Sequence, residues 1–320
     1  MGPEPSGLHH VTGLAGDPQA NVEFYAGALG LRFLVHTVNF EDVLMAHLYY
    51  GDDAGSPGSV VTFFPTPTAD PGRVGKPQVS AVGFAVPAGS LSYWADRLAA
   101  AGHPVEGPTE RFDERVLSTT DPDGTRVELA AAAPVSEPRL EGPVPDRASI
   151  RGLAGVSVLS ANPYATASVL ETLGFGRVGQ EGDRVRYRAA SERTAVVDLL
   201  DREAAFGREG PGTIHHVALR VRDREELLEW HDYFRGREYD VSRIRDRHFF
   251  HSLYVREPGG VLIELATAGP GLEAATPAPE LYLPPRFEDD RELVESQLPP
   301  LRSPRSIGER ADETGGEPSP

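Results

Sequence analysis

One order of elements recurs four times along this chain: a short apolar strand, a helix and then several further strands. In the first unit, Asp17 can cap a helix that has Pro18 at its first position, and Gly30 can end it. A repeat period of roughly 60 to 75 residues predicts tandem βαβββ modules. The four units begin near residues 8, 79, 152 and 213.

The chain also divides at a segment rich in proline and charge. PVSEPRLEGPVPDRA lies between the second and third units and is typical of a linker. We therefore expect two modules in an N-terminal domain (7–133), a linker (134–149) and two modules in a C-terminal domain (150–285). Residues 286–320 are expected to form one short helix and then, from Pro299, a tail with the composition of a disordered segment.

Composition excludes several classes of protein. The 320 residues include no cysteine, so any metal must be bound by His, Asp, Glu or water. The net charge of −17 argues against a nucleic-acid partner, which needs clustered Lys and Arg. No apolar run approaches the roughly 18 residues of a membrane helix, and the N-terminus lacks a signal-peptide pattern. We expect a cytoplasmic protein that binds no membrane, with a homo-oligomer left open.

Two histidine doublets stand at equivalent places in the first and fourth units. His9 and His10 lie in GLHHVTG, and His215 and His216 lie in GTIHHVALRV. Successive side chains of a strand point to opposite faces, so one histidine of each pair faces a given pocket unless a twist or bulge turns the other. Glu264 follows on the last strand of the fourth unit. Two inward imidazoles and one carboxylate can hold a metal and leave coordination positions open.

Aligning the four units on their strands tests this interpretation of the doublets. The position of His10 corresponds to Ala81 in the second unit, Gly155 in the third and His216 in the fourth. The second and third units therefore lack the histidine. We expect them to be structural.

The same alignment compares the last strands. The position of Glu264 corresponds to Thr62 in the first unit, Glu128 in the second and Asp198 in the third. DPDGTRVELA around Glu128 closely resembles EPGGVLIELA around Glu264, but the unit of Glu128 has no histidine. We therefore interpret Glu128 as a structural residue.

These features together resemble the vicinal oxygen chelate superfamily, which includes glyoxalase I, bleomycin-binding proteins and extradiol ring-cleaving dioxygenases. The closer resemblance is to the four-module hydroquinone-type ring-cleaving dioxygenases, and it spans roughly residues 7 to 300. Four blocks in this order carry it: LHHVT near the start, GTIHHVA at 212–218, RDRHFFHSLYVREPGGVLIELATAGPG at 245–271, and LPPRFE at 283–288.

The resemblance implies an α+β fold in which four tandem βαβββ modules pair into two curved mixed-sheet half-barrel domains. It implies that His10, His216 and Glu264 bind Fe(II), although the same ligands also accept Mn(II). It further implies a group of residues near the bound substrate: His9, Thr12, His215, Arg247 and Tyr254.

The function that we expect is an Fe(II)-dependent, extradiol-type dioxygenase that opens a hydroquinone or catechol-like aromatic ring with O2. A glyoxalase-type site typically has a further protein ligand at the position of Thr62, whereas three ligands leave room for substrate and O2 together. Two alternatives stay open: a glyoxalase-type metal-dependent lyase or isomerase, and a non-catalytic resistance protein that binds an aromatic compound or antibiotic.

Other residues receive weaker assignments. We expect His36, His47 and His103 to be solvated or packing histidines, while His248 and His251 flank the proposed site. The aromatic residues that are candidates to line or back a pocket are Trp230, Phe249 and Phe250.

Overall fold

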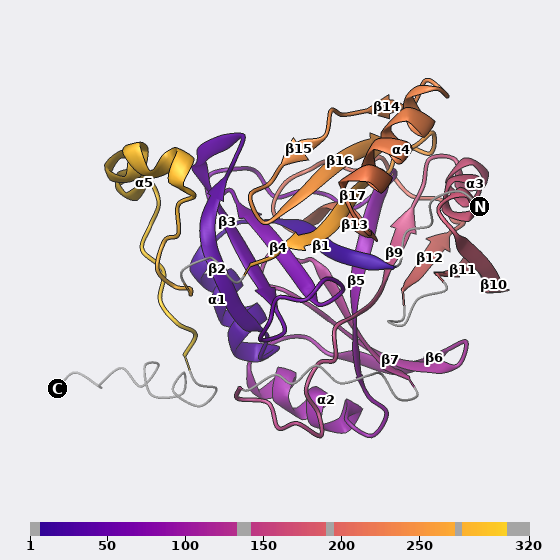
Figure 1. The fold of residues 1–320 in the computed structure, drawn as a ribbon. Coiled ribbons are helices and arrows are strands. Elements are labelled where there is room, and N and C mark those ends of the chain that lie inside the picture. The colour runs from indigo at the N-terminus through magenta and orange to yellow at the C-terminus, as the bar shows by residue number, and fades with distance from the viewer. Residues whose placement is uncertain (1–6, 133–141, 190–194, 273–276, 306–320) are drawn as a thin grey trace.

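The structure is a computed structural model that describes residues 7–132, 142–189, 195–272 and 277–305 (Figure 1). Residues 134–141 of the predicted linker and 306–320 of the predicted tail lie outside the described residues. Within the described ranges, 17 strands belong to one hydrogen-bonded network. No helix in this part of the chain is long and apolar enough to cross a membrane.

The first two predicted units are present, each as a strand, a helical segment and further strands. The elements of the first unit are β1 (Leu8–Ala15), α1 (Pro18–Val22), the π-helical segment η1 (Glu23–Ala28), β2 (Arg32–Asn39), β3 (Asp42–Gly51) and β4 (Val60–Pro65). Those of the second unit are β5 (Gln78–Pro87), α2 (Leu91–Ala100), β6 (Glu106–Arg111), β7 (Glu114–Thr120) and β8 (Arg126–Ala132).

The third and fourth units repeat this order, which confirms the predicted α+β class. The elements of the third unit are β9 (Leu153–Leu159), α3 (Pro163–Thr172), β10 (Phe175–Glu181), β11 (Arg184–Ala189) and β12 (Val196–Leu200). Those of the fourth are β13 (Thr213–Val221), α4 (Arg224–Arg235), β14 (Asp240–Val241), β15 (Arg245–Asp246), β16 (Phe250–Arg256) and β17 (Leu262–Pro270).

Two of the helices, α1 and α4, begin at aspartates whose side chains cap them. The Asp17 side chain accepts hydrogen bonds from the backbone N–H groups of Gln19 and Ala20, at 2.7 and 3.0 Å, and Pro18 follows it. Asp223 caps α4 in the same way. These caps satisfy N–H groups that the first turn of a helix leaves without partners.

Strand pairing groups the units differently from their order in the chain. In each unit the first strand runs parallel to the last, as β1 does to β4 and β13 does to β17. The first strands then join units in antiparallel pairs, β1 with β13 and β5 with β9. The first unit therefore forms one half-barrel with the fourth, and the second forms another with the third.

Figure 1 shows the consequence of this pairing: β1, near the N-terminus, lies beside β13 of the fourth unit, and β13 in turn pairs with β17. We call the half-barrel of units one and four the outer half-barrel, and that of units two and three the inner half-barrel. A bridge between Ile214 and Val79 links the two.

The C-terminal segment packs on the outer half-barrel beside β2 and β3 (Figure 1). It contains the 3-10 helix η2 (Pro285–Asp290) and α5 (Arg291–Gln297), and its Leu283 and Val294 are buried against Val38. Residues 299–305, which composition assigned to a disordered tail, instead reach α1 and η1. The backbone N–H groups of Arg302 and Arg305 each donate at 3.0 Å, to the side chains of Gln19 and Glu23 respectively.

Candidate metal centre

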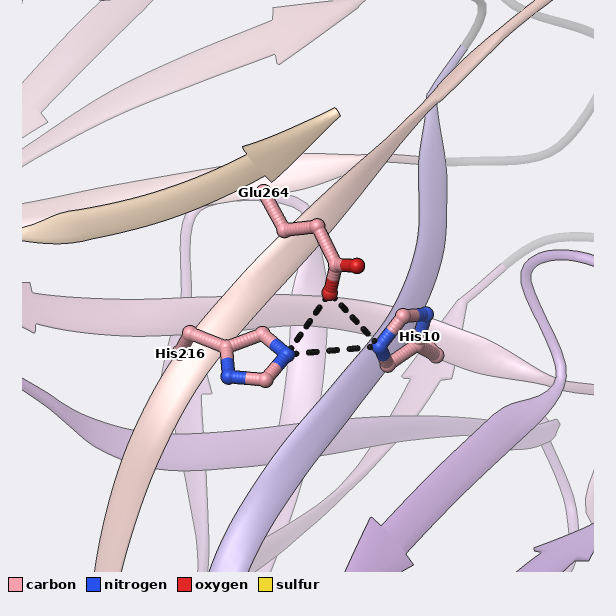
Figure 2. Close-up of side chains that lie close together, drawn as sticks. All are labelled: His10, His216 and Glu264. Carbon is pink, nitrogen blue, oxygen red and sulfur yellow. Dashed lines mark hydrogen bonds and ion pairs between the residues drawn. The ribbon is translucent and has the colours of Figure 1, made fainter. Parts of the chain in front are cut away.

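Three side chains from the two ends of the chain converge inside the outer half-barrel (Figure 2). Nε2 of His216 lies 2.8 Å from Oε2 of Glu264, and Nε2 of His10 lies 3.1 Å from the same oxygen. The two Nε2 atoms are 3.3 Å apart. All three residues are buried, with Glu264 at 0% exposure. No other cluster of His, Asp or Glu in the described ranges brings three such atoms together.

Strand register explains this convergence. Thr12 on β1 lies opposite His216 on β13. On the other side of β13, Ala218 lies beside Glu264 of the parallel strand β17. Residues two apart on a strand share a face, so His216 points to the same side as Glu264. The sequence alignment predicted these three residues as neighbours.

Both histidine doublets lie at irregularities in the pairing of β1 with β13. The register shifts between Leu8 and His10, and it shifts again on β13 between Ile214 and His216. His9 and His215 are therefore the extra residues of two β-bulges. A bulge re-aims a side chain that strict alternation would turn away. The sequence left open that a bulge could turn the other histidine of each doublet, and the structure contains a bulge at both doublets.

The bulges bring each first histidine against its neighbour. Nδ1 of His9 lies 2.9 Å from Nδ1 of His10, and Nε2 of His9 lies 3.0 Å from the backbone carbonyl of Thr267. Because a carbonyl only accepts, Nε2 of His9 must donate to it, so neutral His9 accepts at Nδ1. His10 then carries its proton on Nδ1 and keeps the lone pair of Nε2 free. The contact with His9 thus sets the His10 tautomer that a metal ligand needs.

The second doublet has the same contact but a different outer neighbour. Nδ1 of His215 lies 2.8 Å from Nδ1 of His216. His215 is only partly buried and lines a large cavity. The two doublets therefore differ: His9 is anchored to the backbone, whereas His215 faces the cavity.

Electrostatics favour neutral imidazoles beside an ionised carboxylate. Burial lowers the pKa of His216 to about 4 and outweighs the opposing effect of Glu264. Burial likewise lowers the pKa of His9 to about 3. Burial alone would raise the pKa of Glu264, but the neighbouring imidazoles of His10 and His216 hold it well below its usual value. These are the protonation states of metal ligands.

The donor set fits a divalent metal. Both carboxylate oxygens of Glu264 are buried, and no arginine or lysine among the described residues pairs with them. A buried carboxylate in this state is costly unless a cation compensates it. Two imidazoles and one carboxylate are the donor set of non-haem Fe(II) sites with open positions.

A hydrogen-bonded chain occupies the place of a fourth ligand. Thr62 lies beside Thr12, as Glu264 lies beside Ala218, which makes it the counterpart of Glu264. Its hydroxyl is 2.8 Å from the hydroxyl of Thr12 and 2.9 Å from Nε2 of His47. Thr62 is therefore held by neutral partners on the side opposite the carboxylate.

His47 is a residue of the site that the sequence did not identify. It was expected to be solvated or to pack, yet it lies half-buried between Thr62 and Tyr49, whose hydroxyl lies 3.0 Å from Nδ1 of His47. Burial lowers its pKa well below the usual value, and His10 and Arg247 add to the effect. The pairing of β3 with β4 could have revealed it. Tyr49 on β3 is the register partner of Thr62, and His47 lies two residues before Tyr49 on the same face of the strand.

Arg247 and Tyr254 lie together beside the candidate ligands. The Arg247 guanidinium donates to the Tyr254 hydroxyl at 3.1 Å, and Tyr254 is the register partner of Glu264 on β16. Burial raises the pKa of Tyr254, and the charge of Glu264 raises it further, so the phenol keeps its proton. Glu41 lies 3.3 Å from the Arg247 guanidinium and fixes its other side.

A cavity of about 480 Å³ opens beside this group. His215, His216, Arg247 and Tyr254 are among its lining residues. The rest of the lining combines apolar side chains, Leu14, Met45, Phe64 and Leu262, with the charged Glu41, Glu209 and Arg245. An aromatic ring fits a cavity of this size and lining.

The remaining candidates have other roles. Trp230 packs in the core against Phe234 rather than at a pocket, whereas Phe249 and Phe250 line a small hollow beside His10. His36 is buried with Nδ1 3.1 Å from the Pro279 carbonyl. Nε2 of His248 lies 2.8 Å from the Tyr282 hydroxyl and so contacts the C-terminal segment.

The fold and site agree with a comparison against known families. A model of the Glyoxalase/Bleomycin resistance protein/Dioxygenase superfamily matches residues 7–129 and 169–265. The match covers more than half of the chain, so the chain belongs to this superfamily. The family resemblance seen in the sequence is thereby confirmed.

Individual relatives carry more specific names. The chain is 39% identical over 307 residues to "Putative ring-cleaving dioxygenase MhqO" of Bacillus subtilis (strain 168), over 94% of this chain and 98% of the relative. It is 31% identical over 270 residues to the chlorohydroquinone/hydroquinone 1,2-dioxygenase of Sphingobium indicum, over 81% of this chain and 84% of the relative. A crystal structure of a "putative dioxygenase" from Bacillus subtilis matches with a TM-score of 0.91 and 38% identity, over 95% and 99% of the two chains.

Proposed function

We propose that this protein is an Fe(II)-dependent ring-cleaving dioxygenase of the extradiol type, acting on a hydroquinone or catechol-like ring with O2. His10, His216 and Glu264 would hold the metal, and Mn(II) is the other ion that such ligands accept. The names of the relatives support a dioxygenase. The substituents on the ring are not defined by these names or by the cavity.

One observation carries the choice of an oxygenase: the candidate ligands number three, and a hydroxyl stands where a fourth would be. Thr62 is engaged by Thr12 and His47, at 2.8 and 2.9 Å, and offers no carboxylate. A glyoxalase-type centre with a ligand at this position would be more nearly closed. Bound Fe(II) with three protein ligands supplies open positions at which a substrate oxygen and O2 can both bind.

The surrounding residues suit a phenolic substrate. Arg247 and the protonated Tyr254 present N–H and O–H donors at the inner end of the cavity, where they can orient a ring oxygen and stabilise negative charge on it. His215 faces the same cavity; because a ligating His216 donates to its Nδ1, neutral His215 carries its proton on Nε2 and can donate a hydrogen bond to a substrate oxygen. His9 orients His10, and Thr12 helps to hold Thr62.

Oxygen consumption by anaerobically iron-loaded protein tests the proposal. With substituted hydroquinones we expect O2 uptake in step with loss of the ring absorbance. A lyase or isomerase would turn over with Ni(II), Co(II) or Zn(II) and without O2. A binding protein would saturate stoichiometrically and form no product. Either result would contradict the proposal.

A single substitution sharpens this test. Thr62→Glu should supply the missing fourth ligand, so the protein should keep its metal and lose O2 uptake. Thr62→Ser preserves the hydroxyl that contacts Thr12 and His47 and is the matched control. Undiminished O2 uptake by a metal-loaded Thr62→Glu protein would argue against a role for the open coordination sphere.

A further inference from the structure

A second, much smaller hollow touches the candidate metal centre from another side. It is lined by His9 and His10 at one end and by Val60, Phe249, Phe250 and Leu272 along its walls. Its lining shares no residue with that of the large cavity. His10 belongs to the hollow and His216 to the large cavity, and their Nε2 atoms are 3.3 Å apart. The metal centre therefore lies between two separate spaces.

The two spaces differ greatly in size. The small hollow offers about 20 Å³, enough for one molecule of the size of water, whereas the large cavity offers about 480 Å³. An aromatic ring does not fit the small hollow. Any occupant must be a molecule of two or three atoms.

The polar atoms at the hollow are already engaged. Both ring nitrogens of His9 have partners, Nδ1 of His10 contacts His9, and the Tyr49 hydroxyl lies 3.0 Å from His47. A buried water needs two to four polar partners, and the side chains lining this hollow offer none beyond the candidate ligand atom of His10. The remaining wall is apolar, which favours a small apolar molecule over water.

We propose that this hollow binds O2 and admits it to the metal centre, while the aromatic substrate enters through the large cavity. The inference rests on the proposed dioxygenase function for its second reactant. Small residues, Gly55, Ala268 and Gly271, line the hollow. Ala268 is exposed, so the hollow reaches the surface near the end of β17. The two reactants then do not compete for one entrance.

Narrowing the hollow tests the proposal through kinetics. Ala268→Phe places a large side chain at the exposed mouth of the hollow. Val60→Leu is an independent variant that fills the hollow beside His10, the register partner of Val60. Each should raise the KM for O2 about tenfold and leave the KM for the hydroquinone unchanged. Met45→Phe, in the wall of the large cavity, is the matched control and should affect only the KM for the hydroquinone. An unchanged KM for O2 in both narrowed variants would overturn the proposal.

A measurement without turnover separates this inference from the proposed function. In the full chain loaded with Zn(II), dissolved O2 under pressure should speed the NMR relaxation of the Val60 and Leu272 methyl groups, because O2 is paramagnetic. Ala268→Phe should abolish the effect. Relaxation no faster than that of other buried methyl groups would overturn the O2 site. Fast relaxation in a protein that never consumes O2 would support the site and refute the oxygenase.

Discussion

The two half-barrels share one architecture and differ in what they place at its centre. In the outer half-barrel, His10 and His216 face Glu264, with Thr62 opposite. At the equivalent positions the inner half-barrel has Ala81, Gly155, Glu128 and Asp198, as the register of β5 with β8 and of β9 with β12 confirms. Both centres thus contain a carboxylate on a last strand, but only one has imidazoles.

Arginines replace the imidazoles as partners in the inner half-barrel. Arg111 donates to both carboxylate oxygens of Glu128, at 2.7 and 2.9 Å. Arg186 donates to Asp198 at 2.8 and 2.9 Å and to Glu114 at 2.8 Å. These carboxylates are paired with guanidinium groups, whereas Glu264 lies beside the imidazoles of His10 and His216. The fold places the carboxylate, and the neighbouring side chains decide whether a cation can be bound there.

The bulges, by contrast, occur in both halves. The pairing of β5 with β9 shifts at Ser80 and at Ala154, which correspond to His9 and His215. Bulges therefore belong to the way in which first strands join, and the histidines use a distortion that is present without them.

The largest expected effect contrasts the two carboxylates. Glu264→Gln should reduce bound metal from near one per chain to near zero, because it removes the only anionic ligand of the group. Glu128→Gln should leave the metal in place, because its carboxylate is bound by Arg111. Metal analysis of both purified variants checks this. Equal metal loss in the two variants would contradict the prediction that only the outer half-barrel binds the metal.

The stability of the same two variants should show the reverse order. Glu128→Gln leaves the half-buried Arg111 without its anion and should lower the free energy of unfolding by about 2 kcal/mol. Metal-free Glu264→Gln should be destabilised less, because it leaves beside it two imidazoles that can stay neutral, whereas Glu128→Gln leaves a permanently charged guanidinium. Urea denaturation of the metal-free proteins measures both.

A smaller effect concerns the bulge residues. His9→Ala should weaken metal affinity roughly 10- to 100-fold, because it frees the His10 ring to rotate and change tautomer. Ser80→Ala, at the equivalent bulge, should change neither affinity nor metal content. Competition with a chelator gives both affinities. A His9→Ala protein that binds metal as tightly as the wild type would assign His9 to packing against Phe250.

The smallest effect is a pH dependence in the turn before β8. Burial raises the pKa of Asp121 to about 6, although hydrogen bonds from Thr125 oppose the shift. The folded state therefore holds this proton more tightly than the unfolded chain. The stability that results is present below about pH 4 and is lost as the pH rises to about 6.

Asp121→Asn removes this dependence. Relative to the wild type, the variant should gain about 2 kcal/mol of unfolding free energy between pH 4 and pH 7. Glu257→Gln, in the corresponding turn of the outer half-barrel, should gain with the same sign, because burial also raises the pKa of Glu257. Denaturation curves at several pH values test both. A difference that does not vary with pH would contradict the assignment.

Much of the candidate site follows from the sequence because each part has a local signature. Local signals show where the elements of each unit begin and end. These signals are the helix caps at Asp17 and Asp223, the histidine doublets, and the turns before β8 and β17. Once the boundaries are known, alignment alone brings Glu264 and Thr62 to equivalent positions. The register of β4 and β17 agrees with that alignment.

What the sequence did not reveal depends on contacts between distant strands. His47 has no motif of its own and gains its place only when β3 pairs with β4. Arg111 and Arg186 resemble ordinary charged positions on strands until they meet the carboxylates of Glu128 and Asp198. Composition likewise gave no indication that residues 299–305 would reach Gln19 and Glu23.

The distance along the chain between the candidate ligands constrains how the protein is made. His216 follows His10 by 206 positions, and Glu264 comes later still, on the final strand of the last unit. During translation, His10 leaves the ribosome long before the other two exist. Because a site assembled from distant segments forms only with the fold, a metal could be bound there only after nearly complete synthesis.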